Sequence, residues 1–248
     1  KETTRVWPTI NLNYAIVGKE LHAFVGVDQK KVINDLKNIL EFAPWANSRF
    51  RTLNVNTARE YFAGVRGNFS LINYEGRVGY RQNTNQTLFT NYRVVSLETS
   101  DRVSIDYTNM NTIFINGNID FEVSKLLTVG GALIKNFYNP ELAEYAYGLL
   151  GLEINAWGKL RLLNDKLMIK SNLYVADRSV SLYPSALNLP QTVRGTNLFD
   201  LNFGAEIWPI AKVAIFADAY NVLNNKNVRW YGYPQVGIHF NAGVIVKF

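Results

Sequence analysis

The sequence of 248 residues contains no cysteine and only two histidines, His22 and His239. Without cysteine, disulfide frameworks, thiolate metal sites and cysteine nucleophiles are all excluded. Each histidine stands alone in a strand-like segment, so the sequence offers no histidine-rich metal site. We therefore expect no catalytic residue, no metal and no cofactor, and we do not expect an enzyme.

Long hydrophobic runs are also missing. A membrane helix needs about 20 consecutive apolar residues, whereas the longest candidate here, Leu126 to Ile134, is about half that length and contains two glycines. This excludes a helical membrane protein. The first residues, Lys1 to Arg5, are not followed by the apolar stretch of a signal peptide. We therefore expect a mature or truncated chain.

The positive charge is not concentrated anywhere. The net charge is +6 and the pI is about 9.4, but no run of Lys and Arg is longer than two residues. The basic residues lie singly along strand-like segments, whereas nucleic-acid binding requires a basic patch or stripe. We therefore expect no nucleic-acid partner.

The order of apolar and polar residues carries the main signal. Hydrophobic residues make up 48% of the sequence, yet the mean hydropathy is only −0.08, because the two kinds alternate. Alternation with a period of two predicts strands with one apolar face. In the last segment, the apolar face consists of Ile238, Phe240, Ala242, Val244, Val246 and Phe248.

The alternation predicts about eleven strands. They are expected at 5–17, 20–28, 58–71, 74–83, 102–123, 126–137, 148–162, 166–177, 197–208, 212–223 and 235–248. Short connections are expected at Gly18-Lys19, Ile72-Asn73, Ser124-Lys125, Asn164-Asp165 and around Pro209, and long ones at 29–57, 84–101, 138–147, 178–196 and 224–234. Within the first long connection, the spacing from Val32 to Phe42 predicts a short helix before Pro44.

Two all-β folds compete for this pattern, a soluble β-sandwich and a membrane barrel. The predicted strands run about 10–14 residues, longer than the 5–6 residues typical of soluble strands. Tight turns also alternate with long loops, as in outer-membrane barrels. The sequence therefore predicts an all-β, antiparallel transmembrane β-barrel of about 11–12 strands, with residues 1–248 as one barrel domain in the lipid of a bacterial outer membrane.

The count of eleven strands has a topological consequence. If the last strand runs toward the periplasm, eleven strands place residue 1 on the extracellular side, whereas bacterial single-chain barrels have an even number of strands with both ends periplasmic. Either the count is off by one, or strands upstream of Lys1 are missing. We favour the second explanation and expect the chain to be part of a larger barrel.

The polar faces of the strands would line the barrel interior. Trp157 is expected to face inward and is a candidate ligand contact, whereas Trp208 and Trp230-Tyr231 lie near strand ends and fit an aromatic belt at the membrane interface. The candidate ligand contacts in the lumen are Trp157, Arg66, Arg77, Arg161, Glu153, Asp200 and Glu206.

The C-terminal region carries the most specific motifs. Tyr220-Asn221-Val222-Leu223-Asn224 is followed by Trp230-Tyr231-Gly232-Tyr233-Pro234 and then by the alternating final strand. This ending resembles that of TonB-dependent receptors, and it is closest to the receptor-like barrels of Bacteroidota. The resemblance is strong over 195–248 and looser over 57–194. The final residues also resemble the signal read by the barrel-assembly machinery, a partner during insertion, and its residues here are Ile238, Phe240, Val244, Val246 and Phe248.

The resemblance implies uptake of a bulky nutrient across the outer membrane, driven through TonB. The plug domain, the TonB-contacting segment and the full barrel of some 22 strands of that family are not recognised in these residues, so we expect the chain to lack upstream strands and any plug. Two alternatives remain. The first is a non-transporting barrel that serves as a scaffold in a secretion or assembly complex and holds surface or periplasmic lipoproteins against the loops 29–57 and 178–196. The other alternative, an outer-membrane enzyme, would need His239 as a base.

Overall fold

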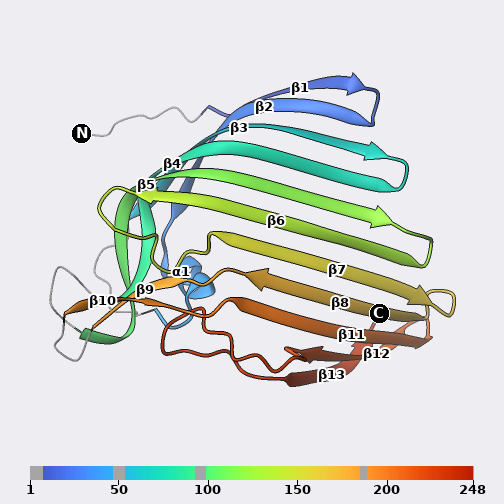
Figure 1. The fold of residues 1–248 in the computed structure, drawn as a ribbon. Coiled ribbons are helices and arrows are strands. Elements are labelled where there is room, and N and C mark those ends of the chain that lie inside the picture. Colours follow the sequence, from blue (N-terminus) through green and yellow to red (C-terminus); the bar gives the residue numbers. More distant parts are fainter. Residues whose placement is uncertain (1–7, 47–53, 93–98, 185–188, 248) are drawn as a thin grey trace.

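The computed structural model describes residues 8–46, 54–92, 99–184 and 189–247. Eleven strands form one antiparallel sheet in the order β1-β2-β3-β4-β5-β6-β7-β8-β11-β12-β13. The strands lie side by side in a curved sheet (Figure 1), and no pairing between described residues joins β1 to β13. The predicted number of strands is therefore confirmed for this sheet, as is their antiparallel order.

The largest extensions of strands beyond their predicted segments are those of β2, which ends at Ile33, and β4, which ends at Tyr92. The strands of the large sheet are β1 Ile10–Val17, β2 Leu21–Ile33, β3 Val55–Phe69, β4 Ile72–Tyr92, β5 Thr99–Glu122, β6 Leu127–Pro140, β7 Leu152–Leu162, β8 Leu167–Ala176, β11 Leu198–Ile210, β12 Val213–Tyr220 and β13 His239–Val246. A separate two-stranded sheet pairs β9 Val180–Pro184 with β10 Pro190–Arg194.

Two predicted loops are partly strand. The segments 29–57 and 84–101 were expected to connect strands, but β2 continues to Ile33 and the β4–β5 hairpin continues to Tyr92 and Thr99. The β4 extension is rich in Asn, Gln and Thr on both faces, and the β2 extension begins with the three polar residues Gln29 to Lys31, so neither shows the apolar alternation that marks a strand. Backbone pairing in register extends them nonetheless, for example between Thr87 and Tyr107.

The short turns gather at one end of the sheet, which we call the turn end, and the long connections gather at the other, the loop end (Figure 1). The turns at Gly18-Lys19, Ser124-Lys125 and Asn164-Asp165 fall where predicted. Two turns are displaced by about two residues, because Ile72 already belongs to β4 and Pro209 lies within β11. By the architecture of outer-membrane barrels, the turn end is periplasmic and the loop end extracellular.

The one described helix, α1 Leu36–Phe42, lies at the loop end between β2 and β3. Asp35 caps it, since its carboxylate accepts a hydrogen bond of 2.8 Å from the backbone N–H of Asn38. The predicted helix is confirmed in its second half, whereas Val32 and Ile33 belong to β2. No helix among the described residues is long and apolar enough to span a membrane.

One face of the sheet carries large apolar side chains in the open. In β5, Ile113, Ile115, Ile119 and Phe121 are 36–52% exposed, although each is a large hydrophobic residue. Cross-strand pairing continues this face, because Ile113 pairs with Tyr80 on one side and with Phe137 on the other. Such a continuous apolar face requires lipid contact, because water would not stabilise it. The alternate side chains point to the opposite, inner face.

One charged residue, Lys135, occupies an outward position in β6. It pairs with Ile115, but its ammonium group lies 5.2 Å from the ring centre of Phe137, one outward position closer to the loop end. A long lysine stem can lie along apolar surface while its charge reaches toward the polar interface. This geometry allows the charge in an otherwise apolar row.

Candidate functional site

The inner face is the candidate functional surface, and its wall is built from pairs of aromatic residues and glycines. Phe24 pairs across strands with Gly64, Phe62 with Gly26, and Phe114 with Gly79. A Cβ at Gly79 would lie 2.5 Å from the ring of Phe114, so only glycine leaves room for the ring to lie flat. The rings therefore form part of the wall itself.

Three arginines lie over these rings. The guanidinium of Arg66 is 5.5 Å from the ring centre of Phe24, that of Arg77 is 5.4 Å from Phe114, and that of Arg81 is 4.9 Å from the same ring. Arg66 also donates a hydrogen bond of 2.7 Å to Asn13 Oδ1. Cation–π contacts hold the guanidinium groups against the wall and leave them facing the interior. Arg66 and Arg77 thus lie on the predicted face, while sequence reasoning did not select Arg81.

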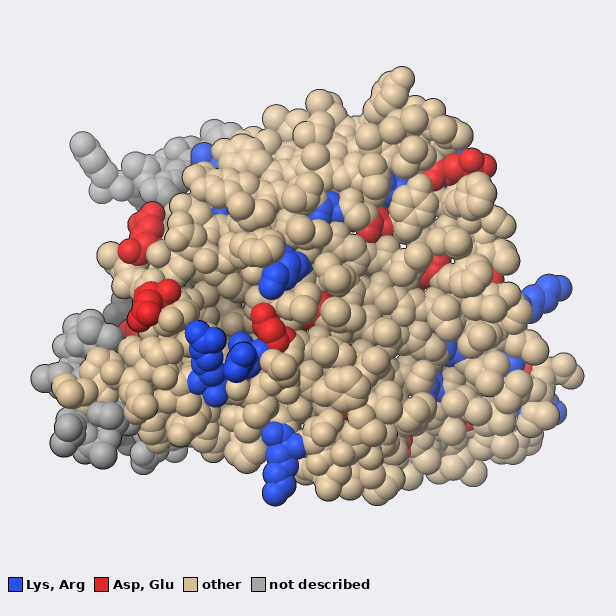
Figure 2. Space-filling view, viewed as in Figure 1, with Lys and Arg blue, Asp and Glu red and all other residues tan. Residues whose placement is uncertain are grey.

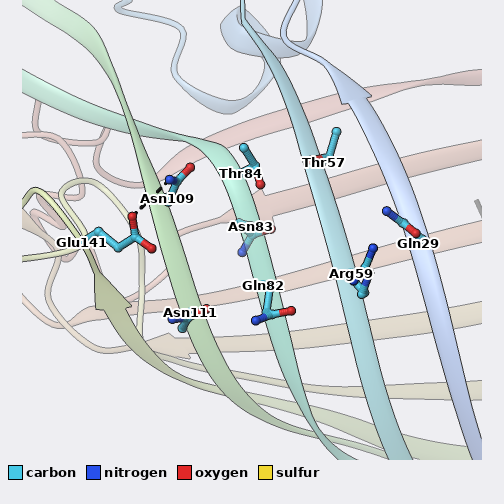
Figure 3. A pocket seen from close by; sticks show the side chains of 9 residues that line it. All are labelled: Gln29, Thr57, Arg59, Gln82, Asn83, Thr84, Asn109, Asn111 and Glu141. Carbon is cyan, nitrogen blue, oxygen red and sulfur yellow. Dashed lines mark hydrogen bonds between the residues drawn. The ribbon is translucent and has the colours of Figure 1, made fainter. Parts of the chain in front are cut away.

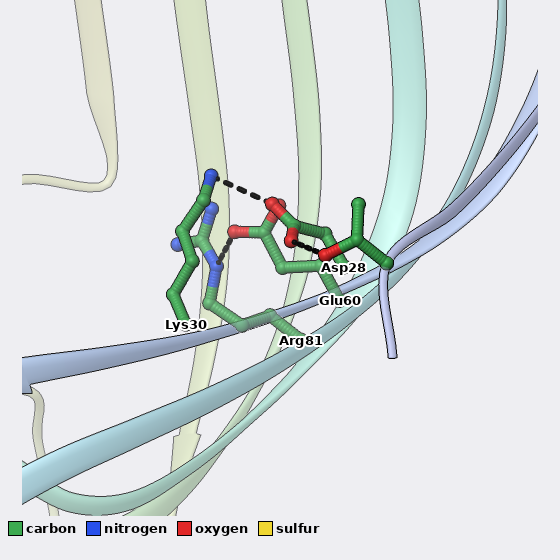
Figure 4. A network of polar contacts seen from close by, with 5 residues as sticks. Asp28, Lys30, Glu60 and Arg81 are labelled. Atoms are coloured by element: carbon green, nitrogen blue, oxygen red, sulfur yellow. Dashed lines mark hydrogen bonds and ion pairs between the residues drawn. The ribbon is translucent and has the colours of Figure 1, made fainter. Parts of the chain in front are cut away.

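A polar network stands toward the loop end of the same strands (Figure 4). Arg81 Nε donates to Glu60 Oε1 at 2.5 Å, and Asp28 forms an ion pair of 3.0 Å with Lys30. Glu60 is only 5% exposed, and its second carboxylate oxygen has no hydrogen-bond partner among the described residues. Removing Arg81 would leave a buried, uncompensated charge, so the pair fixes the local wall geometry.

A second group lies on β7, β8 and β11. Tyr174 donates a hydrogen bond of 2.6 Å to Glu153 Oε2, and Asp200 pairs with Tyr174 in the register. One carboxylate oxygen of Asp200 is buried without a hydrogen-bond partner among the described residues. Glu153 and Asp200 are therefore both close to Tyr174. They form an acidic group on this part of the inner face, whereas the arginines of β3 and β4 form a basic one.

The remaining predicted contacts lie near the turn end. Glu206 forms an ion pair of 3.2 Å with Lys170 and accepts a hydrogen bond of 2.6 Å from Trp208 Nε1. Arg161 lines a small hollow with Trp208. The predicted belt position of Trp208 is wrong, because its indole bonds to the inward-facing Glu206 and carries Lys247 at 4.0 Å above its ring. The structure thus divides the seven predicted residues into separate groups.

Trp157 faces inward, as its alternation predicts. It pairs with Gly130 across strands, and a Cβ on that glycine would lie 2.5 Å from the indole. The ring therefore lies over the wall in the same way as the phenylalanines. Its role as a ligand contact stays a prediction.

The loop end contains the main apolar core. This loop cluster consists of Ile39, Ala43, Ala46, Phe89, Val103, Ile105 and Trp230. Trp230, which follows β12, lies 5.3 Å from Phe89 of β4 in an edge contact. Strands β5 to β8 and β11 separate β4 from β12 in the sheet, so the β12–β13 loop must cross the concave side to make this contact.

The loop cluster overturns a second aromatic-belt assignment. Trp230 is only 6% exposed, so it is buried in protein and does not face the membrane interface. Arg229 beside it lies 4.8 Å from the ring centre of Phe42, and its Nε is buried without a partner among the described residues. Burial also raises the pKa of the nearby loop residue Tyr147. Sequence reasoning missed this cluster because its members come from distant segments.

Asparagines anchor the crossing loop. Asn221 is 3% exposed with a φ of 49°, and its side-chain amide donates to the carbonyls of Asn225 at 2.8 Å and Val236 at 3.1 Å. Asn224 accepts a 3.0 Å bond from the N–H of Ile238. The motif that carried the family resemblance is therefore also the device that shapes the loop. Asparagine suits it, because asparagine tolerates the left-handed backbone region.

The predicted assembly-signal residues point outward. Ile238, Phe240, Val244 and Val246 are 43–74% exposed, and Phe248 lies outside the described residues.

Charge on the surface is dispersed, since Figure 2 shows charged side chains singly or in small groups on the face in view, without a continuous basic area.

Solved structures of outer-membrane receptors share this fold. The ferripyoverdine receptor of the outer membrane of Pseudomonas aeruginosa matches with a TM-score of 0.72 and 11% identity, over 100% of this chain and 33% of that one. The FrpB iron transporter from Neisseria meningitidis matches with a TM-score of 0.69 and 12% identity, over 99% of this chain and 40% of that one. For the copper transporter OprC, the TM-score is 0.66 and the identity 10%, over 98% of this chain and 40% of that one.

The chain thus spans 33–40% of the length of these receptors. Neither a protein-family model nor a curated protein sequence matches it. At identities of 10–12%, the likeness establishes the fold. The chain has the fold of an outer-membrane β-barrel wall, and its exposed apolar face places it in a bacterial outer membrane.

Proposed function

We propose that this chain forms part of the barrel wall of a receptor that takes up a bulky nutrient across the outer membrane, with energy delivered through TonB. The observation that carries the proposal is the contact between Trp230 and Phe89, because it folds an extracellular loop over the interior. A receptor needs such a cover to hold its ligand before transport, whereas an open pore does not.

The charges under and within this cover support a bound polar ligand. Arg229 stands in the loop cluster with one buried N–H unpartnered, and Asp200 presents an unpartnered carboxylate oxygen on the wall. Unsatisfied buried polar atoms are costly, so a ligand that satisfies them gains affinity. The named receptors of the same fold act on ferripyoverdine, iron and copper. Metal chelates are therefore the first ligand class to test.

The test compares uptake in cells that have or lack the gene. Cells would receive labelled iron and copper as a panel of chelates, and accumulation would be measured with and without a functional TonB. We expect uptake of at least one chelate to require both. Unchanged uptake of the whole panel in cells without the gene, together with stable co-purification of lipoproteins, would overturn the proposal in favour of a scaffold.

A matched pair of variants localises the ligand contact. Arg229→Gln removes the partly buried cation of the loop cluster, while Lys226→Gln removes an exposed cation from the same loop. We expect Arg229→Gln to lower uptake by about tenfold or more, the loss of one charged hydrogen bond. Lys226→Gln should behave as the unaltered protein. Equal uptake by both variants at equal surface levels would remove Arg229 from the site.

We further infer that the protein has no catalytic role. The ring of His239 stacks on Tyr220 at 5.0 Å, and its Nδ1 lies 3.0 Å from the carbonyl of Gly237. These contacts support a wall position for the histidine. A hydrolytic activity that is lost in His239→Ala would contradict this inference. On the strength of the Tyr220 to Asn224 motif, we also infer an origin in Bacteroidota. On the strength of the alternating apolar residues from Ile238 to Phe248, we infer recognition of the last strand by the barrel-assembly machinery.

A further inference from the structure

The outer face of β2 to β6 changes from apolar to polar between two neighbouring rows of cross-strand pairs. Cross-strand pairing places Tyr61, Tyr80 and Ile113 in one row, between Val27 and Phe137. The next outward row toward the loop end contains Gln29, Arg59, Gln82, Asn111 and Asn139, without an apolar residue. Aromatic residues at such a boundary mark the membrane interface. The polar row therefore stands at the level of the lipid headgroups.

Above this boundary lies a polar hollow of about 500 Å³. Figure 3 shows its lining side chains on neighbouring strands, with a 3.1 Å hydrogen bond from Asn109 to Glu141. Amides and hydroxyls predominate, among them Gln29, Thr57, Gln82 and Asn111. The Oε1 of Gln29 is buried and has no hydrogen-bond partner among the described residues.

Two cations, Arg59 in the lining of the hollow and Lys31 beside it, remain available for an anion. Arg59 is exposed, and within the described part of the chain no carboxylate forms an ion pair with it. Lys31 is also exposed. It pairs with Thr57 in the outward row that follows the row of Arg59 toward the loop end. Two cations thus stand beside a group of amides and hydroxyls that can donate to and accept from sugar hydroxyls.

Directly below lies an apolar groove of about 540 Å³ on the same strands. Ala63 stands between Val25 and Val78 in the pairing, and its small side chain leaves the sheet hollow at this point. Tyr61 and Tyr80 also line the groove. On β3, Tyr61 is two residues from Arg59, and on β4, Tyr80 is two residues from Gln82; both Arg59 and Gln82 line the polar hollow. The two depressions therefore follow one another along the same strands.

We propose that this surface binds an anionic glycolipid of the outer leaflet, with an acyl chain in the groove and the charged sugar headgroup in the hollow. The order of the two depressions matches the order of the two halves of a lipid. Arg59 and Lys31 would bind the phosphate or carboxylate, and the amide row would bind the sugar. This site lies outside the barrel wall, so it is separate from the proposed uptake of a ligand through the interior.

The headgroup is tested by titration of the full-length protein, purified in mild detergent, with lipopolysaccharide in mixed micelles. The double variant K31A/R59A removes two cations at the loop end, and K19A/K125A removes two exposed cations from the turns at the opposite rim. We expect K31A/R59A to bind at least about tenfold more weakly, and K19A/K125A to bind as the unaltered protein does. If the double variant does not fold, as judged by its heat-modifiable migration, Arg59→Gln alone replaces it.

The acyl chain is tested by filling the groove. Ala63→Trp places an indole in the hollow of the sheet, whereas Ala205→Trp places one at another exposed, outward alanine in β11. We expect only Ala63→Trp to weaken binding, and the deacylated saccharide to bind more weakly than the whole lipid. Equal binding by all variants would mean that the lipid merely joins the detergent belt, and equal binding of the deacylated saccharide would show that the groove takes no acyl chain. Either result would overturn the proposal.

Discussion

At the scale of single residues, the alternation of side chains along each strand decides whether a side chain contacts lipid or faces the barrel interior. Phe203 is 46% exposed on the outer face, while its neighbour Asn202 turns inward and accepts a hydrogen bond from the backbone N–H of Asn221. This follows from the pleat, because successive Cβ atoms in a strand point to opposite faces. The sequence was sufficient for this distinction, since a polar side chain in lipid has no partner to replace water.

An arginine scan tests this assignment of faces. Phe203→Arg should lower the free energy of unfolding by about 2–4 kcal/mol if residue 203 lies near the bilayer midplane, because a cation is then held in hydrocarbon. Asn241→Arg, on the inner face of β13, should cost little. The measurement is urea unfolding from phospholipid vesicles. Comparable losses in the two variants would contradict the orientation of the sheet.

At the scale of elements, the sequence predicted the strands that carry an apolar face and failed where both faces are polar. The hairpin of β4 and β5 extends beyond its predicted ends because main-chain hydrogen bonds continue through Gln, Asn and Thr residues. Hydrophobic alternation reports contact with lipid, not backbone pairing, so it is lost where strands leave the membrane. Strands β9 and β10, of five residues each, pair with one another within the segment 178–196, which the sequence predicts to be a loop.

The loop after β12 depends on Asn221. Asn221→Ala removes three side-chain hydrogen bonds, including one of 3.0 Å from the N–H of Asn225. It also places alanine at a positive φ, so we expect about 2–4 kcal/mol less stability in this loop. Limited proteolysis should then cleave between residues 222 and 236. Lys226→Ala in the same loop serves as the control, and equal resistance of both variants would show that Asn221 is not the anchor.

At the scale of the whole molecule, loops from distant parts of the chain form one body over the concave face. The ring of Trp45 stacks on Tyr233 at 4.8 Å, and Phe42 contacts both Phe89 and Trp230. These contacts join the connection after β2 to the connection after β12. The seven candidate lumen residues, in contrast, are spread along the wall and do not form a single site.

Removal of Trp230 tests whether this body is cooperative. Trp230→Ala should destabilise the loop cluster by about 3–5 kcal/mol, the usual cost of truncating a buried aromatic residue. Amide exchange should accelerate by about a hundredfold or more in 36–46 and 227–233 and remain unchanged in β7 and β8. Trp208→Ala, near the turn end, is the matched truncation. Acceleration spread evenly over the sheet would mean that the cover is not a separate unit.

The sequence by itself determined the fold class, the number of strands in the large sheet, the inner and outer faces and the positions of most turns. These properties are local or periodic, since they depend on alternation within a strand and on turn residues between strands. Only the tertiary structure decided that Trp230 is buried against Phe89 and that the phenylalanines lie over glycines of neighbouring strands. Each of these contacts joins residues that are far apart in the sequence. Their relative placement depends on strand register and on the path of the loops, and the residue pattern of a single strand carries no information about either.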